Sequence, residues 1–314
     1  MALGLLVSWN LSASSTAFVS WQMGFLAFVL LGAVDDRLHL RAGSKFLFQA
    51  FVAAAVIVAS GLGLPSLGEV LPGWEPSLGW LAVPFSVLAI SSVMNAVNMS
   101  DGVDGLAGSL MLVAFAGLSG ASILVDRPDT AVLGLASVAV LLAFLVFNLR
   151  GLSGRPARLF MGDAGSLGMG FLLAALSLKV ASPDTGVPPV VVLWFCLVPL
   201  ADGLSVIVSR LARRSGATEP GRDHFHHLLL ARGLSPGGVV AVETGGAVMF
   251  ALGAIVGWRA GLPEWVLASA FAGTLAVFHV SVARSWAAIR GETTGRRVDF
   301  RAPDDAVPAE RGTR

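Results

Sequence analysis

Residues 79–125 read GWLAVPFSVLAISSVMNAVNMSDGVDGLAGSLMLVAFAGLSGASILV, two long apolar runs separated by a short polar segment. The apolar runs cover residues 79–97 and 103–125. Each is close to the roughly 20 residues that an α-helix needs to cross the hydrocarbon core of a bilayer. The stretch therefore predicts two membrane-spanning helices joined by a polar turn.

The whole chain has the same apolar character. Its 314 residues are 55% hydrophobic and 13% charged, with a mean hydropathy of +0.78, whereas a soluble domain carries about 25% charged residues. The net charge of +1 indicates no nucleic-acid partner. Full membrane spans are predicted near residues 16–34, 44–63, 79–97, 103–125, 131–149, 165–181, 187–209, 237–257 and 262–284.

These nine spans predict an all-α fold, a polytopic integral membrane helical bundle that lies in the lipid bilayer. One transmembrane domain is expected over residues 1–284. The polar and charged composition of residues 285–314 is typical of a disordered tail.

The basic residues are distributed unevenly between the two sides of this bundle. When the loops are assigned alternately, 18 of the 21 Lys and Arg residues fall on one side. Basic residues concentrate in cytoplasmic loops, so this side is predicted to be cytoplasmic. The polar clusters lie on the same side, whereas a transporter would place its charges near the membrane midplane. The pattern indicates a site that takes one substrate from water and the other from lipid.

Where the two quoted runs meet, Asn98, Asp101 and Asp104 follow one another at intervals of three residues. Residues at this spacing lie near one face of a helical turn, and their oxygens suit Mg²⁺. Gly102 and Gly105 open the next helix, where free backbone N–H groups suit a phosphate. A plain turn without chemistry is the alternative, but two Asp-Gly steps favour a functional site.

The first full span ends in two adjacent carboxylates, Asp35 and Asp36. They repel each other, so the pKa of one should rise unless a cation lies between them. Such a pair can bind a metal or remove a proton, or it can be a solvated helix end. Lys45 lies at the start of the next span. It is either a clamp for a phosphate or an anchor on the basic side of the membrane.

Residues 155–166, RPARLFMGDAGS, precede another apolar run. Asp163 can hold Mg²⁺, and the glycines around it are expected to expose backbone N–H groups. Phe160 can stack on a base, and Arg158 adds a positive charge. The alternative for Phe160 is an anchor at the membrane interface.

Residues 222–227, RDHFHH, hold three of the five histidines, His224, His226 and His227. Zinc is a weak interpretation because no paired ligand run accompanies them. Imidazoles beside arginines better suit phosphate oxygens, and a solvated basic loop is the alternative. Asp202, about two turns inside a predicted span, is either functional or the structural partner of a donor.

Four segments together resemble the polyprenyl-phosphate N-acetylhexosamine-1-phosphate transferases, the glycosyltransferase family 4 relatives of MraY and WecA. The segments are Gly32–Asp36 with Lys45–Gln49, Asn95–Leu106, Phe160–Ser166 and Arg222–His227, in the family's order, and the resemblance covers roughly residues 1–285. It implies that a lipid phosphate, usually undecaprenyl phosphate, attacks the β-phosphorus of a UDP-N-acetylamino sugar and releases UMP, with Mg²⁺ as cofactor. It also implies a bacterial inner membrane protein with a cytoplasmic active site, and homodimers are common in the family.

The resemblance implies roles for individual residues. Asp163 and Asp36 would bind Mg²⁺, and Asp35 would deprotonate the lipid phosphate. The other catalytic candidates are Asp36, Lys45, Asp101 and Asp104. The substrate-binding candidates are Asn98, Arg158, Phe160 (stacked on uracil), His224, His226 and His227.

The histidine segment and residues 148–160 are similar to the WecA-like branch. This favours transfer of GlcNAc-1-phosphate from UDP-GlcNAc, at the start of an envelope glycan such as lipopolysaccharide O-antigen. Transfer of phospho-MurNAc-pentapeptide in peptidoglycan synthesis is the alternative enzyme. A non-catalytic lipid-binding or transport protein is the alternative of another class. Family members have two helices before the Asp-Asp pair, so the first and most of the second are expected to be absent here.

Overall fold

The structure, a computed structural model, describes residues 16–149, 157–212 and 223–293. Its helices are α2 (Thr16–Leu38), α3 (Ala42–Ser60), α4 (Ala82–Met99), α5 (Leu106–Leu124), α6 (Pro128–Asn148), α7 (Gly162–Val180), α8 (Pro189–Phe195), α9 (Leu197–Ala212), α10 (Phe225–Ala231), α11 (Pro236–Arg259) and α12 (Glu264–Thr293), with a 3-10 turn at Gly79–Leu81. Among these described residues, eight helices are long and apolar enough to span a membrane, and the bent pair α8–α9 makes a ninth if it is one span. The predicted polytopic helical membrane fold is confirmed.

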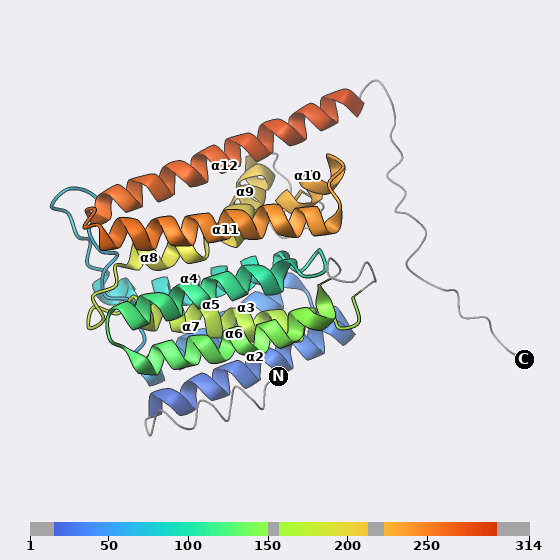
Figure 1. Ribbon diagram of the computed structural model, residues 1–314. Coiled ribbons are helices and arrows are strands. Elements are labelled where there is room, and N and C mark those ends of the chain that lie inside the picture. Colours follow the sequence, from blue (N-terminus) through green and yellow to red (C-terminus); the bar gives the residue numbers. More distant parts are fainter. Residues whose placement is uncertain (1–15, 150–156, 213–222, 294–314) are drawn as a thin grey trace, which may run out of the picture.

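Helices α5 and α7 form the centre of the bundle, and α12 lies at its edge (Figure 1). In α5 and α7, 78% and 72% of the apolar stretch is buried, against 11% in α12. α7 packs against α2 and α4, while α5 packs against α6 and α11. The N-terminal end of α7 is therefore held between the ends of two neighbouring helices.

Glycines allow α7 to approach α2 and α4 closely. A Cβ atom at Gly32 would lie 2.3 Å from the backbone carbonyl of Asp163, and one at Gly170 would lie 3.0 Å from the Cα atom of Met94. Membrane helices use small residues in this way because lipid supplies no hydrophobic drive for their association. The close approach at Gly32 brings the carboxylates at the end of α2 next to the start of α7.

The predicted span at residues 187–209 is broken rather than continuous, which corrects the sequence prediction. α8 ends at Phe195, α9 begins at Leu197, and the two helices are bent by 82°. Pro199 explains the break because it has no N–H to donate to the carbonyl of Phe195. The outer face of α9 exposes Leu204, Ile207, Val208 and Leu211.

Helix α12 extends beyond its predicted end at residue 284 and continues to Thr293. The first part of the predicted tail is therefore helical, which corrects the boundary. Trp286 donates its indole N–H to the carbonyl oxygen of Asp223 at 3.0 Å, so this extension contacts the histidine segment. Residues 294–314 of the predicted tail lie outside the described residues, as do Arg155 and Arg222.

Candidate active site

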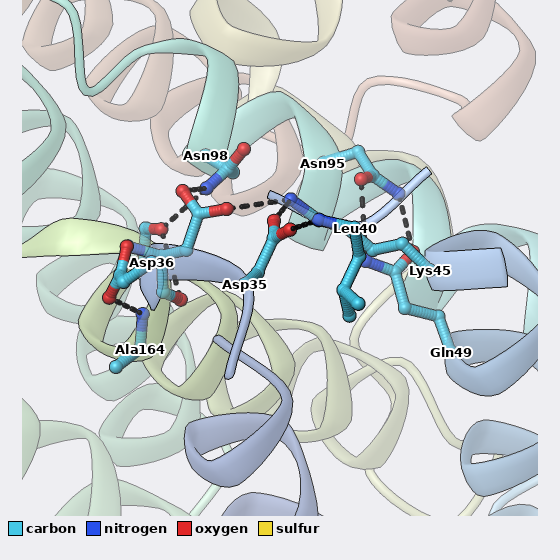
Figure 2. A network of polar contacts seen from close by, with 10 residues as sticks. Asp35, Asp36, Leu40, Lys45, Gln49, Asn95, Asn98 and Ala164 are labelled. Carbon is cyan, nitrogen blue, oxygen red and sulfur yellow. Dashed lines mark hydrogen bonds and ion pairs between the residues drawn. The ribbon is translucent and has the colours of Figure 1, made fainter. Parts of the chain in front are cut away.

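Predicted site residues from separate segments meet at one end of the bundle. Figure 2 shows part of the network of polar contacts that they form. Asp35 lies in the last turn of α2 and Lys45 in the first turn of α3. Asn98 lies in the last turn of α4, Asp101 in the turn that follows, and Asp163 in the first turn of α7. The one-sided clustering predicted from the loops is thus a feature of the folded chain.

Lys45 joins two of the carboxylates. Its Nζ atom lies 2.7 Å from Oδ2 of Asp163 and also forms an ion pair with Oδ2 of Asp35. Asp35 is 8% exposed, and its Oδ1 atom accepts a hydrogen bond from the backbone N–H of Leu40 at 2.8 Å. The cation that the adjacent carboxylates require is therefore Lys45, and it serves Asp35 rather than both members of the pair.

A buried amide pair fixes α3 against α4 one turn further along α3 from Lys45. Asn95 donates from Nδ2 to Oε1 of Gln49 at 2.9 Å, and Gln49 is 1% exposed. Paired amides within a membrane-spanning bundle hold two helices in one register. This contact sets the rotation of α3 that directs Lys45 at the carboxylates (Figure 2).

Asp36 faces the start of α7 instead of Lys45. Its Oδ1 atom accepts the backbone N–H of Asp163 at 2.9 Å, and its Oδ2 atom accepts that of Ala164 at 3.3 Å (Figure 2). A carboxylate at a helix N-terminus satisfies free N–H groups and suits the helix dipole. The backbone N–H groups that the glycines around Asp163 were expected to expose also have acceptors within the chain, since that of Gly162 donates to Asp101 and that of Gly165 to the carbonyl oxygen of Met161, which corrects that expectation. Gly162, with a φ of 62°, allows the turn.

Asn98 orients the carboxylate of Asp163. Its Nδ2 atom donates to Oδ1 of Asp163 and to Oγ of Ser166, each at 2.8 Å. With Lys45 on Oδ2, both oxygens of Asp163 are held in place. A direct contact of Asn98 with substrate stays a prediction.

Asp101 lies in an excess of negative charge. Burial raises the pKa of Asp101 to about 7, and the charges of Asp163, Asp104 and Asp36 add to the effect, although the backbone N–H of Gly162 donates to it and opposes them. Ionised Asp101 is therefore unfavourable unless positive charge is added. The surroundings of Asp101 suit a bound cation.

Asn148, at the end of α6, connects two of the predicted segments and was not singled out from the sequence. It is 3% exposed, and its Oδ1 atom accepts the backbone N–H of Gly105 at 2.7 Å. Its Nδ2 atom donates to the carbonyl oxygen of Leu159 at 2.7 Å. The signal available in the sequence was an amide at the end of an otherwise apolar run.

Arg158 and Phe160 stand apart from the carboxylate network. Both side chains are exposed, Phe160 at 69%. The backbone N–H of Arg158 donates to the carbonyl oxygen of Phe147 at 2.9 Å, which holds the segment against α6. Their side chains are open to a ligand from water, but their binding roles stay predictions.

The histidine segment packs against the Asp101–Asp104 turn. A Cβ atom at Gly102 would lie 2.5 Å from Nε2 of His226, so the imidazole lies directly over this glycine. The rings of His224 and His226 are stacked 5.4 Å apart, and that of His227 lies 4.3 Å from His226. Burial lowers the pKa of His226 to about 4, with a smaller contribution from the charge of His227.

Asp202 anchors this segment, and its contacts fit the structural interpretation of this acid. Its Oδ2 atom lies 2.9 Å from Nδ1 of His224, and its Oδ1 atom accepts the backbone N–H of Phe225 at 2.7 Å. Asp202 is 4% exposed, so both bonds are shielded from water. The break before α9 places this acid beside α10.

Fold and site together define a polytopic helical membrane protein with a carboxylate-rich site at one end of its bundle. The family model of glycosyl transferase family 4 matches residues 18–181. The chain is 32% identical over 269 residues to the undecaprenyl-phosphate alpha-N-acetylglucosaminyl 1-phosphate transferase of Yersinia pestis, which covers 85% of this chain and 73% of that protein. It is 31% identical over 264 residues to the protein of that name from Escherichia coli K12, which covers 83% and 72%. This chain belongs to glycosyl transferase family 4.

A relative from Bacillus subtilis has a similar name. The probable undecaprenyl-phosphate N-acetylglucosaminyl 1-phosphate transferase of Bacillus subtilis is 34% identical over 231 residues, which cover 71% of this chain and 61% of that protein. The family match includes the Lys45 network and the Asp101–Asp104 turn but ends before the histidine segment.

Proposed function

We propose that this chain transfers N-acetylglucosamine 1-phosphate from UDP-GlcNAc to undecaprenyl phosphate, giving undecaprenyl-diphosphate-GlcNAc and UMP. The observation that carries the proposal is the junction of Lys45 with Asp35 and Asp163 at one end of a membrane bundle. The named activities of the relatives supply the substrates. Phosphoryl transfer depends mainly on positioning and charge neutralisation, and this junction supplies groups for both.

The residues present fit Mg²⁺. Within the described residues no three Asp, Glu, His or Cys side chains form a ready metal cage. Mg²⁺ does not need one, because it is commonly held by one or two carboxylates, water and substrate phosphates. Asp163 and Asp36 would hold the ion, and the crowded charges around Asp101 favour an added cation. A bound Mg²⁺ would neutralise charge on the diphosphate and on the departing UMP.

Asp35 is the proton acceptor in this proposal. A non-bridging oxygen of the lipid phosphate attacks the β-phosphorus of UDP-GlcNAc, after its proton passes to Asp35. A new phosphorus–oxygen bond forms, and the bond from the β-phosphorus to the oxygen shared with the α-phosphate breaks. Lys45, beside both Asp35 and Asp163, can turn to a phosphate oxygen and leave the Asp35 carboxylate available.

The remaining candidates bind the donor. Phe160, which is exposed, stacks on uracil, and Arg158 contacts phosphate. Asn98 and the Asp101–Asp104 turn flank the diphosphate. His226, over Gly102, and its neighbours His224 and His227 contact the sugar-phosphate oxygens.

The lipid substrate determines the location that we infer. Undecaprenyl phosphate is held in a membrane and UDP-GlcNAc is dissolved in water, so the site must lie at a membrane surface. We infer that this surface is the cytoplasmic face of a bacterial inner membrane. The excess of Lys and Arg in the loops on the same side supports this orientation. The homodimer stays a prediction, which cross-linking in native membranes would test.

A donor comparison tests the proposed function. Purified protein in detergent is supplied with undecaprenyl phosphate, Mg²⁺ and UDP-GlcNAc, UDP-GalNAc or UDP-MurNAc-pentapeptide, each labelled in the sugar. Lipid-linked label is expected from UDP-GlcNAc. Label only from the pentapeptide donor would assign the chain to peptidoglycan synthesis instead. If the folded protein gives no labelled lipid from any donor, the chain is a non-catalytic membrane protein.

A further inference from the structure

Glu243, on α11, is a buried acid that neither the sequence patterns nor the proposed function uses. It is 4% exposed and lies in the inward stripe of α11, which also includes Val239, Val240, Ala247, Ala251 and Ala254. An acid in such a stripe is costly within a membrane-spanning helix, and such residues are functional by default. Glu243 occurs seven residues after the start of α11, near the end of the bundle that carries the site.

Within the described part of the chain, Glu243 forms no ion pair with a cation on the elements packed against α11. Among them, α5 and α8 have no titratable side chain. α9 supplies Asp202, whose negative charge acts on Glu243, and Arg210, which pairs with Asp223 at 3.9 Å. α12 supplies His279, which contacts Ser205 at 3.1 Å, and Arg284 near its far end. An ionised Glu243 would face a like charge in a poorly solvated place, so the neutral acid is favoured.

The fifth packed element, α10, carries a nitrogen atom that complements a neutral acid. Within the described residues, Nδ1 of His226 and Oε1 of Glu243 are both buried without a hydrogen-bond partner. α10 lies beside the first turns of α11 (Figure 1). A neutral imidazole has one nitrogen that must accept, and a carboxylic acid has one O–H that donates. His227, next to His226, is exposed in part and takes other contacts.

We propose that Glu243 is a positioning residue for the histidine segment. As a neutral acid, Glu243 donates a hydrogen bond to Nδ1 of His226. The proposal requires the Glu243 side chain to rotate towards α10, which packs against α11, and both groups already lie within the influence of the Asp202 charge. Because Nδ1 then accepts, the ring proton resides on Nε2, the nitrogen over Gly102. The N–H is thereby directed at the turn where the donor's diphosphate binds, so this role rests on the proposed function. Groups behind an imidazole commonly fix its tautomer in this way.

The low pKa of His226, about 4, agrees with an imidazole that stays neutral. A neutral ring needs a donor at Nδ1 rather than a carboxylate. The need for a hydrogen-bond donor distinguishes two substitutions at this buried position, Glu243→Gln and Glu243→Leu. Gln keeps a donor without a titratable proton, and Leu has similar bulk without a donor.

Three variants test the role in the transfer assay. Glu243→Leu is expected to lower kcat by roughly tenfold, because the hydrogen bond that orients His226 is lost. The thermal midpoint should not fall, because the same substitution also removes a buried polar group. Glu243→Gln is expected to lose no more than about threefold. Thr244→Val, which removes a buried hydroxyl on the next residue, is the matched control and should leave kcat unchanged. In a His226→Ala background, Glu243→Leu should add no further loss, since the pair acts as one unit.

A second readout is independent of turnover. The chain has five histidines, so nitrogen NMR of isotope-labelled histidine can resolve the His226 ring. The Nδ1 resonance is expected at a hydrogen-bonded position in the unaltered protein and in Glu243→Gln, and at a free position in Glu243→Leu. Equal damage from Gln and Leu, or an Nδ1 resonance that ignores Glu243→Leu, would overturn the proposal. An unaltered protein that transfers no sugar phosphate would overturn the proposed function alone, because the NMR comparison still decides the hydrogen bond.

Discussion

Nζ of Lys45 lies 2.7 Å from Oδ2 of Asp163, and the same ammonium group pairs with Asp35, so one cation joins the end of α2 to the start of α7. In a bundle whose described helices are mostly apolar, this junction concentrates charge at one end. Both acids depend on a single lysine, whose side chain is only 16% exposed. The site is therefore sensitive to any change at Lys45.

Lys45→Met is expected to lower turnover on the order of a hundredfold, because a positioned positive charge is lost. It should also destabilise the protein by about 3 kcal/mol, since two partly buried carboxylates lose their partner. Detergent thermal denaturation and the transfer assay measure the two effects. Arg41→Met, which removes an exposed cation just before α3, is the control and should change neither quantity appreciably. Equal effects of the two substitutions would remove the special role of Lys45.

Asp163→Ala is expected to abolish Mg²⁺-dependent turnover while the protein still folds in detergent. Folding is retained because Lys45 keeps its contact with Asp35. Metal titration followed by thermal shift should show that added Mg²⁺ no longer raises the midpoint. Full activity in this variant would exclude Asp163 as a metal ligand.

Asp35→Asn is expected to lose turnover and to keep UDP-GlcNAc binding. The amide cannot take the proton of the lipid phosphate, whereas the proposed nucleotide contacts lie on other segments. Calorimetric titration with UDP-GlcNAc separates the two effects. Loss of binding together with turnover would leave the proton-acceptor role unsupported.

Asp36→Ala is expected to destabilise the protein by about 1 kcal/mol, because the first N–H groups of α7 lose their acceptor. Asp36→Asn keeps an acceptor oxygen and should lose less stability. Both should weaken Mg²⁺ binding if Asp36 is also a ligand. A midpoint unchanged in Asp36→Ala would show that Asp36 does not hold the start of α7.

Stability should depend on His226 in the acid range. The pKa of His226 is lowered to about 4 in the folded protein, against about 6.5 in an unfolded chain. Its contribution is therefore complete above about pH 6.5 and is lost as the pH falls towards 4, because the unfolded chain takes up the proton first. His226→Phe should make the thermal midpoint fall less steeply over this range. His39→Asn, at an exposed position of positive φ, is the control, and equal slopes in all three proteins would refute the assignment.

The sequence predicted the parts of the fold that depend on apolar length and charge. The runs of apolar residues located the spans, and the clusters that flank them meet at one end of the bundle, as with Lys45 and Asp163. The sequence also contains a signal for the break after Phe195, because Pro199 interrupts the helical hydrogen bonds there. Hydropathy alone misses this signal, since it treats proline as an ordinary residue of a span.

Contacts between distant segments could not be predicted from spacing. Asp36 caps α7 across more than a hundred residues, so the first N–H groups of this helix already have an acceptor within the chain. Asn148 gives no sign of its role until Gly105 and Leu159 are placed on either side of it. Asp202 gained a definite role in the same way, when the bend before α9 brought it to His224.

The most direct measurement uses UDP-GlcNAc that carries its radioactive label at the β-phosphorus. The reaction is run in detergent with undecaprenyl phosphate and Mg²⁺, and lipid and nucleotide products are separated. Transfer of the sugar with its phosphate predicts that the label passes to the lipid and that unlabelled UMP is released in equal amount. Transfer of the sugar alone would leave the label in UDP, and that result would contradict the proposed reaction at Asp35, Lys45 and Asp163.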